Sequence, residues 1–372
     1  MTNDEIDRLL ERLRVFSEIP GPSGREELVR EFLLERWRER LATLDVDSRG
    51  NVLGTLGSGR PRLALAAHMD EVGWVVRHVT ADGFLIVDTT QGPRREGPPL
   101  RHMIGHEVHV LGRSGVVASG VFTAASGHVM TREQVERQRL DWPDFFVDLG
   151  IGTRREAEAA GVHIGSPVVF AGPPRRVGRR IVGKAMDDRV SLCVVDVLLE
   201  RLAGASLGCS LVVVATVHEE GGVHGADAAA REIDCDAAVV LDVGLVGDVP
   251  SVGVLEHETR LGGGPTLVHK DGHVVYDHRL TWSIADAAAA GGIAFQHGVY
   301  SHYGSDGIAF VHRGVPTALV GIPTRYTHTA FEMVEPIDVV ATVELLARLA
   351  TDSDFARGVR HVTDLDTRRP DA

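Results

Sequence analysis

The chain has 372 residues, of which 44% are hydrophobic and 24% are charged, a composition typical of a globular protein with a substantial core. Its 52 acidic residues outnumber its 39 basic residues, and the net charge of -13 argues against a broad phosphate-binding surface and hence against nucleic acid as a partner. The length suggests two domains, or one domain with a large insertion.

The cysteines and the N-terminus predict a soluble cytoplasmic protein. Cys193, Cys209 and Cys235 occur singly among apolar residues, so we expect three buried, free thiols and no disulfide framework or thiolate metal site. The chain begins with an acidic segment instead of a basic region followed by an apolar run. No stretch approaches eighteen consecutive apolar residues, so we expect no membrane association.

Near the N-terminus, apolar residues recur at helical spacing and predict a helix that ends before Pro20. Ser23 and Glu26 have the spacing of a capping box, which predicts the start of a second helix. Two strands follow, at residues 51–56 and 63–67. The second is an unbroken apolar run, as in a buried strand.

From residue 71 to residue 169, short β-type runs alternate with Gly and Pro turns, which predicts a small β-rich insertion. Buried strands and helices then alternate again, with a helix expected at 188–202 and strands at 210–217, 237–241 and 317–320. The order predicts an α/β sheet covered by helices on both faces. We expect this domain to comprise residues 1–70 and 170–357, followed by a polar tail at 358–372.

Side chains able to bind a metal follow four of the predicted strands: His68 with Asp70, Glu219 with Glu220, Asp242 and, after a longer loop, His328. Ligands of open α/β sheets gather beyond the carboxyl ends of the strands, so these side chains are candidates for one site. Asp70 lies two residues after His68, on the same side of an extended chain, and is expected to orient the imidazole ring.

Two pairs of adjacent carboxylates add to this pattern. Asp187 and Asp188 stand at the start of a predicted helix, where helix capping is the alternative explanation. Glu219 and Glu220 follow a very hydrophobic strand, where two carboxylates repel each other unless a cation compensates them. One of this second pair could bind metal while the other transfers a proton. A solvated turn is the alternative, although Gly221, Gly222 and Gly225 favour a close-packed bend.

Other catalytic motifs are missing from the sequence. His218-Glu219 begins like the zinc motif His-Glu-x-x-His, but Gly222 occupies the second histidine position. No Gly-x-Ser-x-Gly elbow follows a strand. Most of the 18 histidines must be bystanders, and those of the insertion show no ligand-like spacing: His102, His106, His109 and His163.

Five blocks, in this order, resemble the signature blocks of the glutamyl and tetrahedral aminopeptidase family: residues 65–73, residues 183–189, residues 217–220 with 225–226, residues 241–244, and residues 322–328 with 332–333. Residues 146–150 and 155–158 also resemble the insertion domain of that family. The resemblance implies a mixed sheet of the zinc aminopeptidase type, interrupted by a β-rich dimerisation domain.

The resemblance also implies a role for each candidate residue. Asp187 would bridge two metal ions, with His68 and Asp242 completing one site and Glu220 and His328 the other. Glu219 would act as general base on the water between the ions. The oxygen and imidazole donors suit two zinc ions, and cobalt or manganese would also fit. The family implies a homo-oligomer built from dimers, often a tetrahedron of twelve subunits.

Some positions depart from the family pattern, including His218, Gly221, residues 124–128 and residues 303–307, but none of them is an expected ligand. The expected function is therefore the removal of N-terminal residues from peptides. Two alternatives remain: a metal-dependent deacylase or amidase acting on a small modified amino acid, and a non-catalytic protein on the same scaffold. The sequence does not indicate which N-terminal residue is preferred.

Overall fold

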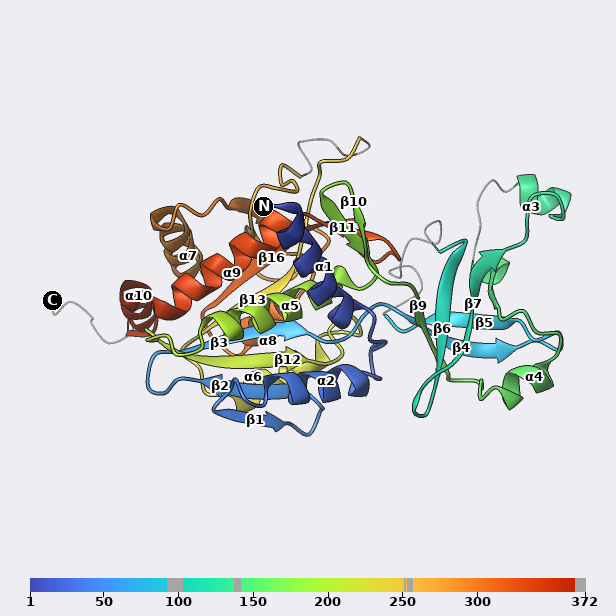
Figure 1. Ribbon diagram of the computed structural model, residues 1–372, viewed down its shortest axis with the longest axis horizontal. Coiled ribbons are helices and arrows are strands. Elements are labelled where there is room, and N and C mark those ends of the chain that lie inside the picture. Colours follow the sequence, from blue (N-terminus) through green and yellow to red (C-terminus); the bar gives the residue numbers. More distant parts are fainter. Residues whose placement is uncertain (92–102, 137–141, 251, 253–256, 365–372) are drawn as a thin grey trace.

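The computed structural model describes residues 1–91, 103–136, 142–250, 252 and 257–364. Figure 1 shows a larger α/β domain joined to a smaller β domain, which is inserted between strands β3 and β10. Parts of the predicted insertion, residues 92–102 with His102 and residues 137–141, lie outside the described residues. The same holds for residues 365–372 of the expected tail, whereas residues 358–364 belong to a helix.

The helices have the following bounds: α1 Asn3–Ser17, α2 Glu27–Trp37, α3 Arg132–Glu136, α4 Arg154–Ala159, α5 Met186–Arg201, α6 His224–Glu232, α7 His278–Ala290, α8 Gly307–His312, α9 Pro336–Thr351 and α10 Ser353–Asp364, with a short 3-10 helix at Trp142–Asp144. The strands of the α/β domain are β1 Thr43–Val46, β2 Val52–Leu56, β3 Arg62–His68, β10 Arg175–Val177, β11 Arg180–Gly183, β12 Ser210–Thr216, β13 Ala237–Leu245, β14 Thr266–Lys270, β15 Gln296–Val299, β16 Thr317–Arg325 and β17 Glu332–Val334. Those of the β domain are β4 Trp74–Val79, β5 Leu85–Thr89, β6 His106–Gly112, β7 Gly115–Ala124, β8 Phe145–Asp148 and β9 Pro167–Phe170.

The large sheet is mixed. Its main path runs in the order β1-β2-β12-β3-β13-β16-β17-β11-β10, with β14 and β15 attached through β16. The four central strands β12, β3, β13 and β16 are parallel to one another. The predicted α/β fold with a mixed sheet is confirmed, and the parallel centre means that four strands end at the same edge.

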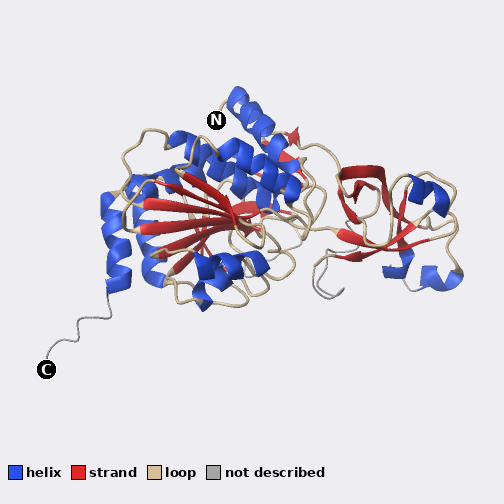
Figure 2. Ribbon diagram, turned by 90° about the horizontal axis from the view of Figure 1, so that it is seen from below, coloured by secondary structure: helices blue, strands red, loops and turns tan. Residues whose placement is uncertain are grey.

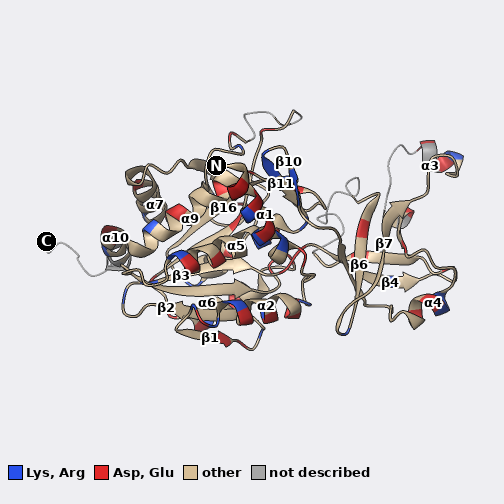
Figure 3. Cartoon of the chain, in the orientation of Figure 1, with Lys and Arg blue, Asp and Glu red and all other residues tan. Residues whose placement is uncertain are grey.

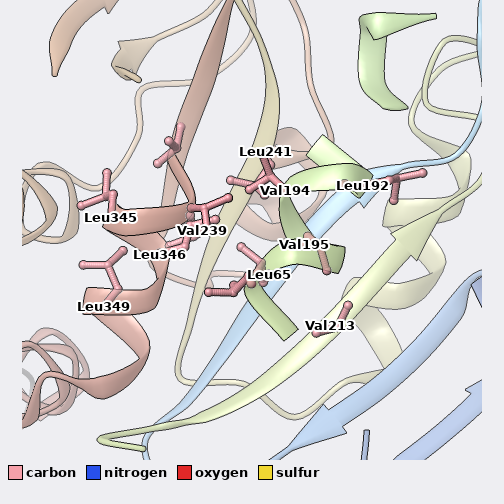
Figure 4. Close-up of a cluster of buried hydrophobic side chains, with 14 of the residues drawn as sticks. Leu65, Leu192, Val194, Val195, Val213, Val239, Leu241, Leu345, Leu346 and Leu349 are labelled. Atoms are coloured by element: carbon pink, nitrogen blue, oxygen red, sulfur yellow. The ribbon is translucent and has the colours of Figure 1, made fainter. Parts of the chain in front are cut away.

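Helices cover both faces of this sheet (Figure 2). Leu63 and Leu65 of β3 point into the larger core with α1, α2, α5, α7, α9 and α10, whereas Ala64 and Ala66 point to the opposite face with α6 and α8. Figure 4 shows part of the larger core, in which aliphatic side chains of the sheet meet those of α5 and α9. Alternation along each buried strand thus supplies both cores, as expected for a sheet covered on two sides.

The smaller domain is a closed barrel with the strand order β4-β5-β8-β7-β6-β9. Its own core contains Trp74, Phe122, Phe145 and Phe170, and the rings of Trp74 and Phe170 pack edge to face with centroids 4.8 Å apart. The insertion is therefore β-rich, as the runs of short strands indicated, and it folds around a separate hydrophobic cluster.

The second helix begins differently from the prediction. The residue before α2 is Glu26, and its side chain does not cap the helix. The capping-box interpretation of Ser23 and Glu26 is therefore wrong. The hydroxyl of Ser23 instead donates to Asp70 at 2.5 Å, and Glu26 accepts the backbone N–H groups of Gly24 and His218. Each of the two side chains thus contacts a segment that is distant in the sequence.

Charged residues of both signs are interspersed over the helices of the α/β domain, while the central strands carry few (Figure 3). Cys193 and Cys209 are buried and Cys235 is only half-buried, which corrects the expectation of three buried thiols. All three are free. No helix among the described residues has the length and apolar character needed to cross a membrane.

Gly225 allows the turn after β12 to pack against the strand that it follows. A Cβ atom at this position would lie 2.2 Å from the carbonyl oxygen of Val217 and 2.5 Å from Oδ1 of Asn51. The side chain of Asn51 accepts from the N–H of Val217 and donates to the carbonyl of Gly225. The close bend predicted from the glycines is confirmed at this point, and it places Glu219 and Glu220 at the sheet edge.

We predict that Gly225→Ala lowers the free energy of unfolding by about 1–3 kcal/mol, because the added methyl group forces backbone atoms apart in a packed core. Gly127→Ala is the control, because a Cβ there meets no atom within 4 Å. Urea unfolding of the two variants measures the difference. Equal stability of both variants would show that the turn has room to relax.

Candidate metal centre

The register of the central strands brings the predicted ligands to one edge. His68 is the last residue of β3 and pairs with Thr216 of β12, directly before the turn that carries Glu219 and Glu220. On the other side of β3, Val240 of β13 pairs with Ala66, so that Asp242 lies level with His68. The parallel pairing therefore places three chain-distant segments side by side.

Asp187 lies between the two histidines. Its Oδ1 atom is 3.2 Å from Nε2 of His68, and its Oδ2 atom is 3.4 Å from Nε2 of His328. Nε2 of His328 is also 3.3 Å from Oε1 of Glu220. Each carboxylate oxygen of Asp187 thus faces a different imidazole, as a bridging ligand requires.

Two groups of potential ligand atoms result, and within each group the atoms lie within 4.8 Å of one another. The first is His68, Asp187 and Asp242, and the second is Asp187, Glu220 and His328. The structure thus brings together all five residues that the sequence suggested as ligands. Asp187 belongs to both groups.

The side chains of Asp187 and Asp188 do not cap α5, and both residues have non-helical backbone angles. The residue before the helix is Ala185, in a left-handed conformation, and no side chain caps the first turn. Asp188 instead contacts the hydroxyl of Ser191 and the backbone N–H of His68. The capping alternative for the Asp187-Asp188 pair is therefore wrong.

Asp70 supports the turn that carries the two glutamates. Its carboxylate accepts the backbone N–H of Glu219 at 2.9 Å and that of Glu220 at 3.1 Å. The ring nitrogen Nδ1 of His68 lies 3.0 Å from the backbone oxygen of Asp70 and 3.5 Å from its carboxylate. Asp70 thus contacts both His68 and the Glu219-Glu220 turn, and its main-chain oxygen is the nearer partner of the ring.

Glu219 lies at the rim of the first group, with Oε2 at 4.0 Å from Nε2 of His68. Its side chain is 11% exposed, so it is close to the ligands yet reachable from solvent. Burial, together with the charges of Asp242 and Glu220, raises its pKa well above the usual value. A nearby cation would stabilise the ionised form of a carboxylate in this environment. The ionised form is the one that can accept a proton beside a metal.

Glu332 and the backbone of the surrounding loops were not assigned any role from the sequence. The carboxylate of Glu332 is buried and accepts the backbone N–H groups of Asp187 and His328, at 2.9 and 2.6 Å. Ala185, His218 and His328 have left-handed φ angles, which cost about 1–3 kcal/mol each for residues other than glycine and concentrate at functional sites. The family resemblance included Glu332 in one of its blocks but gave it no role.

A buried ion pair connects the segments that carry the ligands. Nζ of Lys184 lies 2.8 and 2.7 Å from the two carboxylate oxygens of Glu71, and both side chains are 2% exposed. Glu71 also accepts the N–H of Gly21. The pair joins the segment after His68 to the segment before Asp187. Breaking such a pair leaves an uncompensated buried charge, so it restrains both segments.

The donor set fits divalent cations. Burial and the charge of Asp187 raise the pKa of Asp242, and burial raises that of Asp188. Oε1 of Glu220 is buried and has no hydrogen-bond partner among the described residues. Buried carboxylates are costly unless positive charge compensates them, and imidazole and carboxylate donors without thiolates suit zinc, cobalt or manganese.

The chain matches the family of M42 glutamyl aminopeptidases over residues 50–345. It is 28% identical over 344 residues to the lysyl aminopeptidase of Pyrococcus furiosus. This alignment covers 91% of this chain and 96% of that protein. The solved aminopeptidase APDkam598 from the archaeon Desulfurococcus kamchatkensis superimposes with a TM-score of 0.89 at 28% identity, covering 98% of this chain and 99% of that chain. The TET1 peptidase of Pyrococcus horikoshii, which can assemble into a tetrahedron or a large octahedral shell, has a TM-score of 0.83 at 27% identity, covering 92% of this chain and 99% of that chain.

We predict that His68 and His328 release protons when metal binds. Burial lowers the pKa of His68 and of His328, but the carboxylates around them outweigh burial and raise both values well above 6.5. These carboxylates therefore favour the protonated form of each ring in the metal-free protein, and ligands must be deprotonated to bind. We expect metal affinity to increase as the pH rises through neutrality.

Calorimetric titration of the metal-free protein with zinc, in buffers of different ionisation enthalpy, measures the number of protons released. The observed heat should depend on the buffer. A heat that is the same in every buffer would show that the two rings are already neutral.

Proposed function

The chain belongs to the M42 glutamyl aminopeptidase family and is a peptide hydrolase, and from this premise we propose that it removes N-terminal residues with two divalent metal ions and Glu219 as general base. The proposal rests on one observation above all: each carboxylate oxygen of Asp187 faces a different histidine, and each histidine has a further carboxylate beside it. Two adjacent cation sites that share a ligand account for this arrangement.

His68 and Asp242 would hold one ion, Glu220 and His328 the other, and Asp187 both. When bound, two such ions lower the pKa of a shared water and polarise the scissile carbonyl. The chain's own residues then supply the proton transfer and the alignment. Zinc is favoured by the donors, and cobalt or manganese is compatible with them.

Glu219 is the residue proposed to move the proton. Its carboxylate takes a proton from the attacking water and delivers it to the amine that leaves when the peptide bond breaks. Asp70 holds the turn through the backbone N–H of Glu219 and contacts the ring of His68, so one carboxylate aligns the base with a ligand of the same site. This role of Asp70 is wider than the orientation of His68 alone.

We also propose that the chain forms a homo-oligomer built from dimers, in the manner of a twelve-subunit tetrahedron. The TET1 peptidase assembles into shells, and three valines of β7 on the barrel are exposed here: Val116, Val117 and Val121. Exposed apolar residues grouped on one strand are typical of a contact surface. Light scattering of the purified protein measures the mass of the particle in solution. A monomer at working concentration would contradict the proposed homo-oligomer.

The substrate class is tested with a panel of aminoacyl chromogenic amides. We expect hydrolysis of amides with a free α-amine and none of their N-acetylated counterparts, because an aminopeptidase requires the unblocked terminus. Chelation should abolish the activity, and zinc or cobalt should restore it. Faster turnover of the acylated compounds would favour a deacylase, and no turnover on any compound after metal refilling would favour a non-catalytic protein. The preferred residue is read from the same panel, since the names of the family and of its lysyl relative already differ.

We predict that Glu219→Gln leaves both metal ions bound and lowers kcat by about 10²–10⁴-fold, because the amide cannot accept the proton. The control is Glu232→Gln, which makes the same change at an exposed position of α6. Metal content is measured by atomic absorption and turnover on the best amide of the panel. An active Glu219→Gln enzyme would rule out this role, and loss of metal from the variant would make Glu219 a ligand.

A further inference from the structure

A hydrogen bond between described residues connects the barrel to the proposed metal centre. Gln91 follows the barrel strand β5, and its Nε2 atom donates to Oε2 of Glu220 at 2.6 Å. The two residues are 129 positions apart in the chain. A side chain of the inserted domain thus contacts a proposed ligand of the α/β domain.

The chemistry of the two groups sets the direction of this contact. A carboxylate offers only lone pairs, so the amide must present its nitrogen to Glu220. With Oε2 occupied in this way, the other oxygen of Glu220 faces His328 at 3.3 Å and has no hydrogen-bond partner among the described residues. The hydrogen bond therefore leaves one oxygen of Glu220 available on the side where the cation is expected.

Hydrogen bonds restrain the backbone of the segment that carries Gln91. Its backbone N–H donates to Oγ1 of Thr89, and the N–H and hydroxyl of Thr90 both donate to the carbonyl of Gly73 at 3.0 Å. Gly73 lies at the start of the barrel, packed so closely that a Cβ there would be 2.9 Å from Cβ of Pro22. The segment that carries Gln91 is thereby tied to the junction between the two domains.

We propose that Gln91 is a positioning residue through which the barrel orients Glu220 for metal binding. The proposal rests on the assignment of Glu220 as a ligand in the proposed function. Gln91 acts through Glu220 and contacts no reacting group. Removing a hydrogen-bond partner of a metal ligand typically lowers metal affinity 10–100-fold, so the barrel contributes to the affinity of one of the two ion sites.

The test compares Gln91→Met with Thr90→Val in the full-length protein. Methionine keeps the length of the side chain but cannot donate. Thr90→Val removes only the hydroxyl bond, and the backbone N–H of Thr90 still donates to Gly73, so the segment stays in place and Gln91 is intact. Zinc binding to the metal-free proteins is measured by competition with a chromogenic chelator. We expect Gln91→Met to weaken one of the two sites by about tenfold or more and Thr90→Val to change neither.

Activity gives a second measure. The kcat of Gln91→Met should be low at limiting zinc and should return toward that of the unmodified protein in excess zinc, which a general folding defect would not do. Unchanged zinc affinity in Gln91→Met, or an equal loss in Thr90→Val, would overturn the role of Gln91 while the aminopeptidase assignment stands. If the unmodified protein binds no pair of ions, the proposed function fails, and the role of Gln91 fails with it.

Discussion

The excess of buried negative charge around Asp187 is the constraint on which the rest of the site depends. Asp188, Asp242 and Glu332 interact with its charge, Glu219 lies beside His68, and burial raises the pKa of each of these four carboxylates. Among the described residues only His68 and His328 lie within salt-bridge distance of Asp187. Such a cluster of buried carboxylates is costly unless positive charge compensates it. Bound cations are the simplest source of that charge.

The fold holds these charged side chains in place by restraining the backbone of the segments that carry them. Asp70 accepts two N–H groups from the turn after β12, and Glu332 accepts two more from the segments of Asp187 and His328. Each of these carboxylates fixes a pair of ligand-bearing segments in relation to each other. The ion pair of Glu71 with Lys184 adds a third connection, between the segment after His68 and the segment before Asp187. Backbone hydrogen bonds and a buried ion pair thus hold the candidate ligands in relation to one another.

The inserted barrel is placed where it can affect the chemistry. The chain enters the barrel directly after the segment of His68 and Asp70, and it returns through β10 and β11 just before Asp187. His106 of the barrel also packs against Phe331, beside the loop of His328, with ring centroids 5.3 Å apart. Together with Gln91, these contacts make the barrel part of the surroundings of the metal centre as well as a candidate surface for self-association.

Much of this architecture could be predicted from local patterns. The unbroken apolar runs before His68, Glu219 and Asp242 identified buried strands, because a strand covered on both faces cannot alternate with polar residues. The glycines after Glu220 indicated the tight turn, and the helical spacing near the N-terminus predicted α1, which the structure confirms at Asn3–Ser17. The polar residues that follow these runs could be identified as candidate ligands for the same reason. The predicted strand ends at residues 241 and 320 were wrong, because β13 continues to Leu245 and contains Asp242, and β16 continues to Arg325.

The partners of these residues were decided only by the tertiary structure. Ser23 and Glu26 have the spacing of a helix cap, yet they contact Asp70 and the backbone of His218. The carboxylate of Asp70 is engaged by a turn 149 positions further along the chain, and Gln91 reaches Glu220 across the domain junction. Periodicity and spacing report the conformation of one segment, whereas a hydrogen bond between distant segments depends on strand register and on the path of loops with left-handed residues such as His328. The sequence by itself determined the central buried strands, the turn after β12 and the chemical types of the candidate ligands. Their pairing depended on distances through space, which no local pattern encodes.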